Sequence, residues 1–201
     1  YIKPLTVNFK DHILLNTQVI RVEREEQEVK IVTEEQTDVF DQVVFACHGN
    51  QALAMLARPT PQEKTVLGEF KTSENQVVLH TDTSFLPNRK LGWASWNYNM
   101  IESAKEQTTL TYNMNILQRL HKQHTYLVTL NQEVANEHVL RRFTYHHPIF
   151  TQGAIRSQQL WSTISGKNHS HFCGAYWFNG FHEDGVRSGL RVSDTLKGKQ
   201  P

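Results

Sequence analysis

The sequence predicts a mixed fold, in which an α/β unit drawn from both ends of the chain encloses an α+β unit with an antiparallel sheet. Continuous apolar runs at 43–47 and 171–177 are typical of buried strands in a parallel sheet. Between them lie four strand-like runs, at 77–82, 93–99, 109–114 and 125–131. Polar turns separate these four runs, which favours an antiparallel sheet. An Arg-Pro-Thr-Pro break at 58–61 marks the first junction.

Local patterns predict the remaining elements. Apolar bursts on both sides of the charged stretch 23–28 indicate a hairpin over 13–32, and a further strand is expected at 139–145. Helices are expected at 51–57, from Pro61, at 115–121, at 152–161 and from Asp184 onward. In the last of these helices, the apolar residues that can line a buried side are Val186, Leu190, Val192 and Leu196.

Composition limits the function classes. A length of 201 residues allows one or two compact units, and a net charge of +1 gives no global field that would attract nucleic acid. No stretch approaches the ~20 apolar residues of a membrane span, so stable membrane insertion is not expected. Cys47 and Cys173 lie far apart among apolar neighbours, which suits reduced thiols in a cytoplasmic protein. The abrupt start at Tyr1, without an initiating Met, indicates a fragment.

The segment from Gly174 to Gly189 carries the most specific local pattern. It predicts a strand end, a tight loop and a helix whose first turn is Asp184-Gly185-Val186. The free backbone N–H groups of such a turn and the positive end of the helix dipole favour an anion. Gly185 would let a ligand approach the backbone closely, and Gly189 would let the helix lie close to a neighbouring element. The segment therefore predicts a ligand site, although an ordinary strand-loop-helix corner fits the same local pattern.

Six blocks of sequence resemble one protein family. The blocks are DQVVFACHGNQALAML, VVLHTDTSFLP, WASWNYN, LTYNMNILQRL, FTYHHPIF and CGAYWFNGFHEDGVRSGL. Together they resemble the flavin-containing amine oxidase-like family, in particular a bacterial subgroup of predicted NAD/FAD-binding proteins, over essentially all 201 residues. The resemblance implies a partial FAD/NAD(P)-binding, Rossmann-like domain at 1–57 and 172–201. Residues 58–171 would form an inserted substrate domain with an antiparallel sheet and helices.

The same resemblance implies a cofactor and site residues. The intact protein would bind FAD and transfer a hydride from a carbon of a small-molecule substrate to flavin N5. Val19 would bracket the adenine edge with its backbone amide and carbonyl. The flavin end of the site would be formed by Gly174, Asp184, Gly185 and Val186, with His182 as a general base or a hydrogen-bond partner. The apolar substrate pocket would be lined by Trp93, Trp96, Tyr112 and Trp177.

Two departures from the family pattern limit these expectations. No G-x-G-x-x-G strand-turn-helix occurs, so the pyrophosphate site is absent, and this chain alone is expected to lack FAD and activity. The family commonly places a lysine early in the first strand of the substrate domain, whereas residues 73–76 read Ser-Glu-Asn-Gln. The substrate class therefore stays open between an amine and a lipid-like chain. Without a first strand the parallel sheet would keep an open edge, which predicts self-association.

Other interpretations stand beside this one. The second interpretation is a non-enzymatic binding or interaction module with the same fold. For Trp93, Trp96 and Tyr98 a place in the sheet core is favoured over the pocket, because strands favour aromatic residues for packing alone. A metal hydrolase ranks third, on two pairs of histidines, His121 with His124 and His169 with His171. No Cys-x-x-Cys or His-Glu-x-x-His motif accompanies them, so no metal site is expected.

Overall fold

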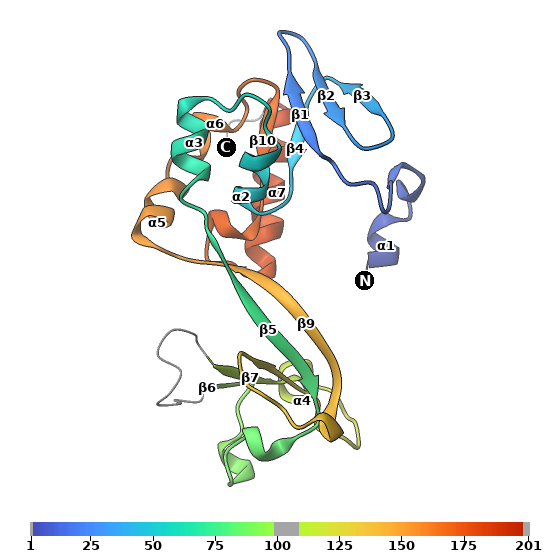
Figure 1. The fold of residues 1–201 in the computed structure, drawn as a ribbon, viewed down its shortest axis with the longest axis vertical. Helices are drawn as coiled ribbons and strands as arrows, with labels where there is room; N and C mark the ends of the chain where they lie inside the picture. The colour runs from blue at the N-terminus through green and yellow to red at the C-terminus, as the bar shows by residue number, and fades with distance from the viewer. Residues whose placement is uncertain (1, 99–108, 199–201) are drawn as a thin grey trace. The chain divides into compact units, whose positions relative to one another are not determined.

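A computed structural model of the chain describes residues 2–98 and 109–198. The chain divides into two compact units (Figure 1): unit 1 comprises Tyr1–Lys71 and Pro148–Pro201, and unit 2 comprises Thr72–His147. The domain boundaries expected from the sequence, 57/58 and 171/172, both fall inside unit 1. The difference arises because three short helices pack with one another and with β10 in unit 1. These helices are α3 (Pro61–Leu67), α5 (Gln152–Gln158) and α6 (Trp161–Ile164).

Several predicted helices are shorter in the structure. The helix expected at 115–121 is reduced to α4 (Met114–Leu117), since Arg119 has a positive φ of 52° and leaves the helical region. The helix expected at 152–161 is split into α5 and α6. The other short helical elements are α1 (Ile2–Thr6), α2 (Gly49–Met55), η1 (Lys10–His12), η2 (Thr83–Phe85), η3 (Lys90–Gly92), η4 (Asn136–His138) and η5 (Ala175–Trp177). In the described part of the chain, no helix has the length and apolar character needed to cross a bilayer.

Unit 1 contains the predicted parallel strands. β4 (Val43–Phe45) pairs in parallel with β10 (Ser170–Phe172), in a register that sets Phe45 beside Phe172. The two phenyl rings stack with their centroids 5.2 Å apart. The parallel pair is therefore confirmed, but β4 is buried on one face only, because Val44 is 42% exposed.

An antiparallel meander precedes β4 in the chain. It consists of β1 (Arg21–Arg24), β2 (Val29–Val32) and β3 (Thr37–Phe40), in that order. The predicted hairpin is confirmed by β1 and β2, but its first strand begins eight residues later than expected. Asn16 has a positive φ of 56°, which interrupts extended backbone between Ile13 and the start of β1.

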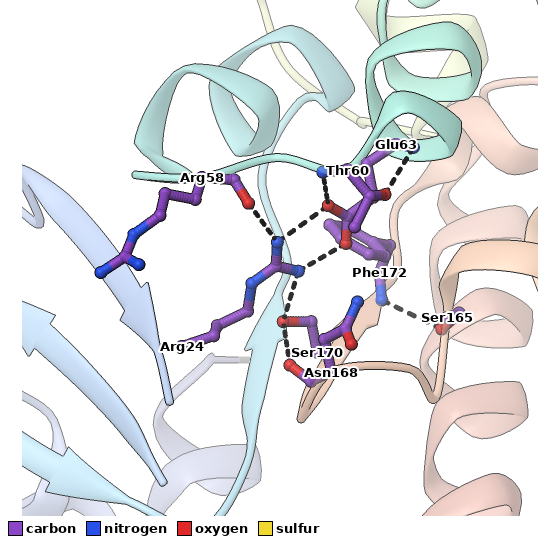
Figure 2. Close-up of polar contacts among 8 residues, drawn as sticks. All are labelled: Arg24, Arg58, Thr60, Glu63, Ser165, Asn168, Ser170 and Phe172. Carbon is purple, nitrogen blue, oxygen red and sulfur yellow. Dashed lines mark hydrogen bonds and ion pairs between the residues drawn. The ribbon is translucent and has the colours of Figure 1, made fainter. Parts of the chain in front are cut away.

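The outer edge of β10 is closed within unit 1. The N–H of Phe172 donates to Ser165 Oγ, and its carbonyl accepts from the indole N–H of Trp161 (Figure 2 shows the first of these). The Ser170 carbonyl accepts from the N–H of Gly166. By contrast, among the described residues β4 pairs with β10 alone. The open edge that the sequence predicts therefore lies on β4.

The last helix, α7 (His182–Leu196), buries a different side from the expected one. Its buried residues are Asp184, Ser188 and Val192, which are four residues apart. Of the four apolar residues expected on the buried side, only Val192 is buried, and Val186, Leu190 and Leu196 are exposed. The hydrogen bonds of the Asp184 carboxylate to the preceding loop turn this polar side inward.

Unit 2 is built on one five-stranded sheet. The strands are β5 (Thr72–His80), β6 (Trp96–Tyr98), β7 (Leu110–Asn113), β8 (Leu127–Leu130) and β9 (Val139–Pro148). Their order is β6-β7-β8-β5-β9. The pairs β6–β7, β7–β8 and β8–β5 run antiparallel, which confirms the predicted sheet. Asn99, the last residue of the run expected at 93–99, lies outside the described residues. The long strands β5 and β9 run side by side in Figure 1, with β9 at the edge of the sheet.

Candidate functional site

Val19 borders a depression in unit 1. Its side chain is half-buried and packs against the hydrophobic core of that unit. The depression measures about 490 Å³ and is lined by Gln18, Val19, Ile20, Cys47, Gln51, Ala54 and Met55. In the described chain, the N–H and the carbonyl of Val19 form no hydrogen bond, whereas the neighbouring N–H of Ile20 donates to Val32. A free backbone donor and acceptor on one residue match the edge of a heterocycle such as adenine.

A glycine is required at position 174, because the chain passes too close to itself there for a side chain to fit. It follows β10 with a φ of +152°, and its N–H donates to Ser188 Oγ at 2.8 Å. A Cβ at this position would lie 2.5 Å from Cε1 of Tyr176. Cys47, whose carbonyl lies nearby, follows β4 on the same edge of the parallel pair. Ligands of open α/β sheets bind outside this carboxyl edge of the strands.

Asp184 holds the loop that precedes α7. Its carboxylate accepts hydrogen bonds from the N–H groups of Phe181 (3.0 Å) and Asn179 (3.2 Å), and the residue is 8% exposed. The carboxylate also brings a negative charge to the start of the helix, where it reduces the attraction of that end for an anionic ligand. The structure therefore gives Asp184 a positioning role, and a direct contact with a cofactor stays a prediction.

The start of α7 is open to solvent around Gly185. Nothing lies within 4 Å of a Cβ built on this glycine, and Val186 is 56% exposed. The N–H of Gly185 already donates to the carbonyl of Phe181, so the free first-turn donors belong to residues 182–184. His182, the first residue of the helix, is exposed. A ligand would meet the backbone of Gly185 through its bare Cα, since no side chain stands in the way.

The four predicted substrate-pocket residues lie in two different units. Trp177 is 2% exposed in the core of unit 1, where its ring meets Phe70 edge-on at 4.7 Å. Trp93, in the loop before β6 of unit 2, donates its indole N–H to the carbonyl of Pro87. Trp96 and Tyr112 pair across β6 and β7 of the same unit. Three of the four therefore belong to unit 2, and Trp177 acts as core in unit 1.

Tyr176 and Trp177 each bury a polar group in the core of unit 1. In the described chain, neither the hydroxyl of Tyr176 nor the indole N–H of Trp177 makes a hydrogen bond of normal geometry. Burial, with the nearby Cys47, raises the pKa of Tyr176 well above its usual range. Tyr176 therefore stays neutral in the folded chain.

Strand register divides the sheet of unit 2 into two contrasting faces. We call one of them the open face, which carries two rows of side chains across four strands. The rows are Trp96, Tyr112, Val128 and Leu79, and Tyr98, Leu110, Leu130 and Val77. Trp96 is 51% exposed and Tyr98 is 64% exposed, whereas Val77, at the β5 end of its row, is only 3% exposed. The rings of Trp96 and Tyr112 meet edge-on at 5.4 Å. Burial raises the pKa of Tyr112, so its hydroxyl is neutral.

The opposite face of this sheet is buried and carries several polar side chains. The N–H of Asp82 donates to Nδ1 of His80, which leaves Nε2 of His80 to donate to Thr129 Oγ1 at 2.7 Å. The hydroxyls of Thr129 and Thr111 are 2.8 Å apart, and these side chains together with His80 are fully buried. Val78 and Leu127 are buried on this same face, so the covered face of the sheet combines polar and apolar side chains.

A ladder of side chains along β9 adds to the open face. The β9 ladder consists of Arg141, Phe143, Tyr145 and His147. The side-chain contact between Asn75 and His147 (3.0 Å) puts these odd-numbered residues on the face of Val77 and Leu79, because the even-numbered Gln76 contacts Thr144 instead. Sequence reasoning did not assign Phe143 or Tyr145 to a site. Their alternation with Arg141 and His147 at every second residue is the signal that was available.

The histidines show no gathering of metal ligands. Within residues 2–98 and 109–198, His, Cys, Asp and Glu side chains nowhere form a group of three suited to hold a metal ion. His169 lies close to the backbone carbonyls of Asp41 and Glu26, and His171 is buried beside Gln42.

Comparison with known proteins identifies the fold. Residues 8–97 match the family model described as flavin containing amine oxidoreductase, which confirms the resemblance over that part of the chain. Putrescine oxidase bound to putrescine superposes with a TM-score of 0.63 at 13% identity, over 97% of this chain and 51% of that one. Cyclohexylamine oxidase from Brevibacterium oxydans IH-35A gives 0.64 at 11%, over 94% and 49%. A CLA-producing fatty acid isomerase from P. acnes gives 0.59 at 12%, over 89% and 47%.

These likenesses concern the fold. At 11–13% identity they show a mixed helix and sheet architecture that matches part of an FAD-binding amine oxidase fold. The chain spans about half the length of these solved structures. No curated protein matches its sequence.

Proposed function

We propose that this chain, which has part of the fold of the flavin-containing amine oxidoreductases, forms the adenine end of the cofactor site and one wall of the substrate site in an FAD-dependent oxidoreductase. Bound FAD supplies the acceptor, flavin N5, for a hydride from a substrate carbon. The observation that carries the proposal is the depression of about 490 Å³ that Val19 lines, together with the N–H and carbonyl of Val19, which form no hydrogen bond in the described chain. That volume lies within the usual range of ~300–1,000 Å³ for ligand sites.

Different residues of unit 1 contact different parts of the cofactor. Val19 brackets the adenine edge, with its N–H donating and its carbonyl accepting. Gly185 and Val186, on the open start of α7, border the flavin, and the free N–H groups of that turn meet negative charge. Gly174 and Asp184 fix the loop that leads into α7. His182, exposed beside this loop, is the candidate proton acceptor or hydrogen-bond partner.

Binding of the whole cofactor needs a further element. The chain contains no G-x-G-x-x-G sequence, so the pyrophosphate must be held by a segment that accompanies these residues, in the same polypeptide or in another. By itself the chain is then colourless and inactive. Cys47 and Cys173 are both free thiols in the structure, and we place the protein in the bacterial cytoplasm.

The substrate wall is the open face of unit 2, with Trp96 and Tyr112 on its first two strands, β6 and β7. Neither an amine nor a lipid-like chain is excluded by this face. A lysine is absent from the start of β5, where Asn75 instead contacts His147 and Asn131. This absence favours dehydrogenation or isomerisation of an apolar substrate as much as amine oxidation.

The test is the visible spectrum of the protein joined to a G-x-G-x-x-G segment. Absorption near ~450 nm, released by denaturation as free FAD, is the expected result. Val19→Pro removes the N–H and should weaken FAD binding about fivefold, the equivalent of one hydrogen bond of ~1 kcal/mol. Val19→Ala keeps the backbone donor and should bind FAD normally. A colourless protein that takes up no added FAD would instead support the non-enzymatic binding module.

A further inference from the structure

The open face carries no acidic side chain. None of its eight residues is Asp or Glu, and none of the β9 ladder residues is acidic either. Its only full positive charge comes from Arg141, at the edge strand, with His147 on the same side. From its first strand to its last, the face therefore runs from uncharged aromatic and aliphatic groups to a cation.

Arg141 is held in place but remains without an ion-pair partner. Its guanidinium carbon lies 5.0 Å from the centroid of the Phe143 ring, and this ring stacks on Tyr145 at 5.4 Å. Among the described residues, no carboxylate pairs with Arg141. The next residue, Arg142, differs, because it donates to the Val134 carbonyl and lies 3.9 Å from a carboxylate oxygen of Glu133. A stacked guanidinium keeps its planar fork free for an anion.

We propose that the open face binds the hydrocarbon chain of an amphipathic carboxylate, with Arg141 at the carboxylate end. This inference rests on the proposed function, because the ligand would be the substrate of the same site. Four inter-strand spacings of ~4.8 Å separate β6 from β9, so the face extends roughly 19 Å and can accommodate most of a long acyl chain. Exposed apolar surface of this kind marks a binding site, and the charge at its end selects the head group.

An amine of equal length is the poorer ligand on this surface. Its ammonium group would find no carboxylate on the open face and would be repelled by Arg141. Aromatic faces of Trp96 and Tyr98 attract a cation, but at exposed sites this attraction is weak. The predicted order of affinity is therefore carboxylate before neutral alcohol before ammonium.

The experiment measures quenching of tryptophan fluorescence in the full chain by 11-bromoundecanoate and by 11-bromoundecylammonium, each below its micelle concentration. The carboxylate should reach half-saturation at a concentration about tenfold lower than the ammonium. Quenching should disappear in Trp96→Phe, which retains the three other tryptophans. Arg141→Gln should weaken carboxylate binding about fivefold, whereas Arg89→Gln, an exposed site with the same change in charge, should leave it unaltered. Tyr98→Ser should weaken both ligands.

Equal or tighter binding of the ammonium, or full binding by Arg141→Gln, would overturn the proposal. Binding to anionic phospholipid vesicles without any binding of the monomeric acid would also overturn it, in favour of a lipid surface. Because no flavin takes part, this outcome is separate from the proposed function. If the carboxylate binds but the protein joined to a G-x-G-x-x-G segment takes up no FAD, the enzyme proposal fails and the ligand class stands. If FAD binds and the carboxylate does not, the ligand class fails alone.

Discussion

Arg24 on β1 and Glu63 on α3 form a two-pronged ion pair that is almost fully buried. Nη1 of Arg24 lies 2.5 Å from Oε1 of Glu63, Nη2 lies 2.8 Å from Oε2, and the exposed fractions of the two side chains are 7% and 1%. Nη2 also donates to the carbonyl of Arg58, and Nη1 reaches Ser170 Oγ on β10 (Figure 2). One guanidinium thus connects the meander, the start of α3 and the parallel pair.

Removing the carboxylate of this pair should be costly. Glu63→Gln leaves the Arg24 guanidinium buried without its counter-charge, for which a loss of about 3–5 kcal/mol in the free energy of unfolding is typical. Arg21→Gln at the exposed pair with Glu23 should cost less than ~1 kcal/mol. Urea unfolding followed by far-UV circular dichroism measures both. Equal losses at the two sites would contradict a dominant role for burial.

The same pair predicts a loss of stability in acid. Burial raises the pKa of Glu63, but hydrogen bonds from Arg24 and from the Thr60 N–H outweigh it, so the pKa is lower in the folded chain than in the unfolded one. The stabilising contribution is then complete above the unfolded value of ~4.3 and is lost as the pH falls below it. In a urea series from pH 6 down to pH 3, Glu63→Gln should show a shallower decline than the parent chain. Parallel declines would exclude Glu63 as a source of the acid sensitivity.

Gly174 and Gly189 offer a matched pair of substitutions. Gly174→Ala places a Cβ 2.5 Å from Cε1 of Tyr176 on a backbone with φ of +152°, and should destabilise the chain by at least ~2 kcal/mol. Gly189→Ala, on α7, meets nothing within 4 Å and should stabilise the chain by about 0.5–1 kcal/mol through helix propensity. Thermal unfolding of the two variants should shift in opposite directions. A loss at Gly189 would mean that another element packs against α7 in solution.

Strands with clear apolar runs could be predicted from the sequence, and their ends could not. The run 43–47 identified β4 because successive Val43, Val44 and Phe45 are rare outside buried strands. The hairpin at 13–32 was predicted too long, since nothing in the pattern signals the positive φ of Asn16. Such backbone turns depend on what surrounds them after folding.

The candidate site was predicted less completely, because a face cannot be assigned from one strand alone. Trp96 and Tyr112 were selected as pocket residues on aromatic character, and the register shows them as neighbours on one face. Which face of the sheet stays open depends on the residues that cover the opposite face. On that opposite face the ring of Phe85 lies edge-on to the ring of His80, with the centroids 5.0 Å apart. Trp177 has the same aromatic character but lies in the core of unit 1. Residue type alone does not distinguish an aromatic residue on the open face from one in the core.

His80 should make unit 2 sensitive to mild acid. Burial lowers its pKa, the charge of Asp82 raises it in part, and His138 lowers it further. The unfolded chain therefore takes up a proton just below ~6.5, where the folded chain does not, and the free energy of unfolding falls as the pH falls through that window. His80→Gln should flatten the dependence between pH 7 and 5, while His146→Gln, at an exposed site, should not. NMR titration of the His80 ring provides a direct check, and a pKa at or above ~6.5 would contradict the argument.

The open edge of β4 predicts self-association of the chain. Its outer backbone groups have no strand partner in the described residues, and Val44 beside them is 42% exposed. Light scattering coupled to size-exclusion chromatography should show a mass that rises with concentration above that of a 23.3 kDa monomer. Val44→Lys, a charge on the edge strand, should shift the mass toward the monomer, whereas Leu190→Lys on the exposed side of α7 should not. If only Leu190→Lys shifts the mass to that of the monomer, α7 provides the contact between copies. A chain that is monomeric at every concentration would mean that the β4 edge is not used for pairing between copies.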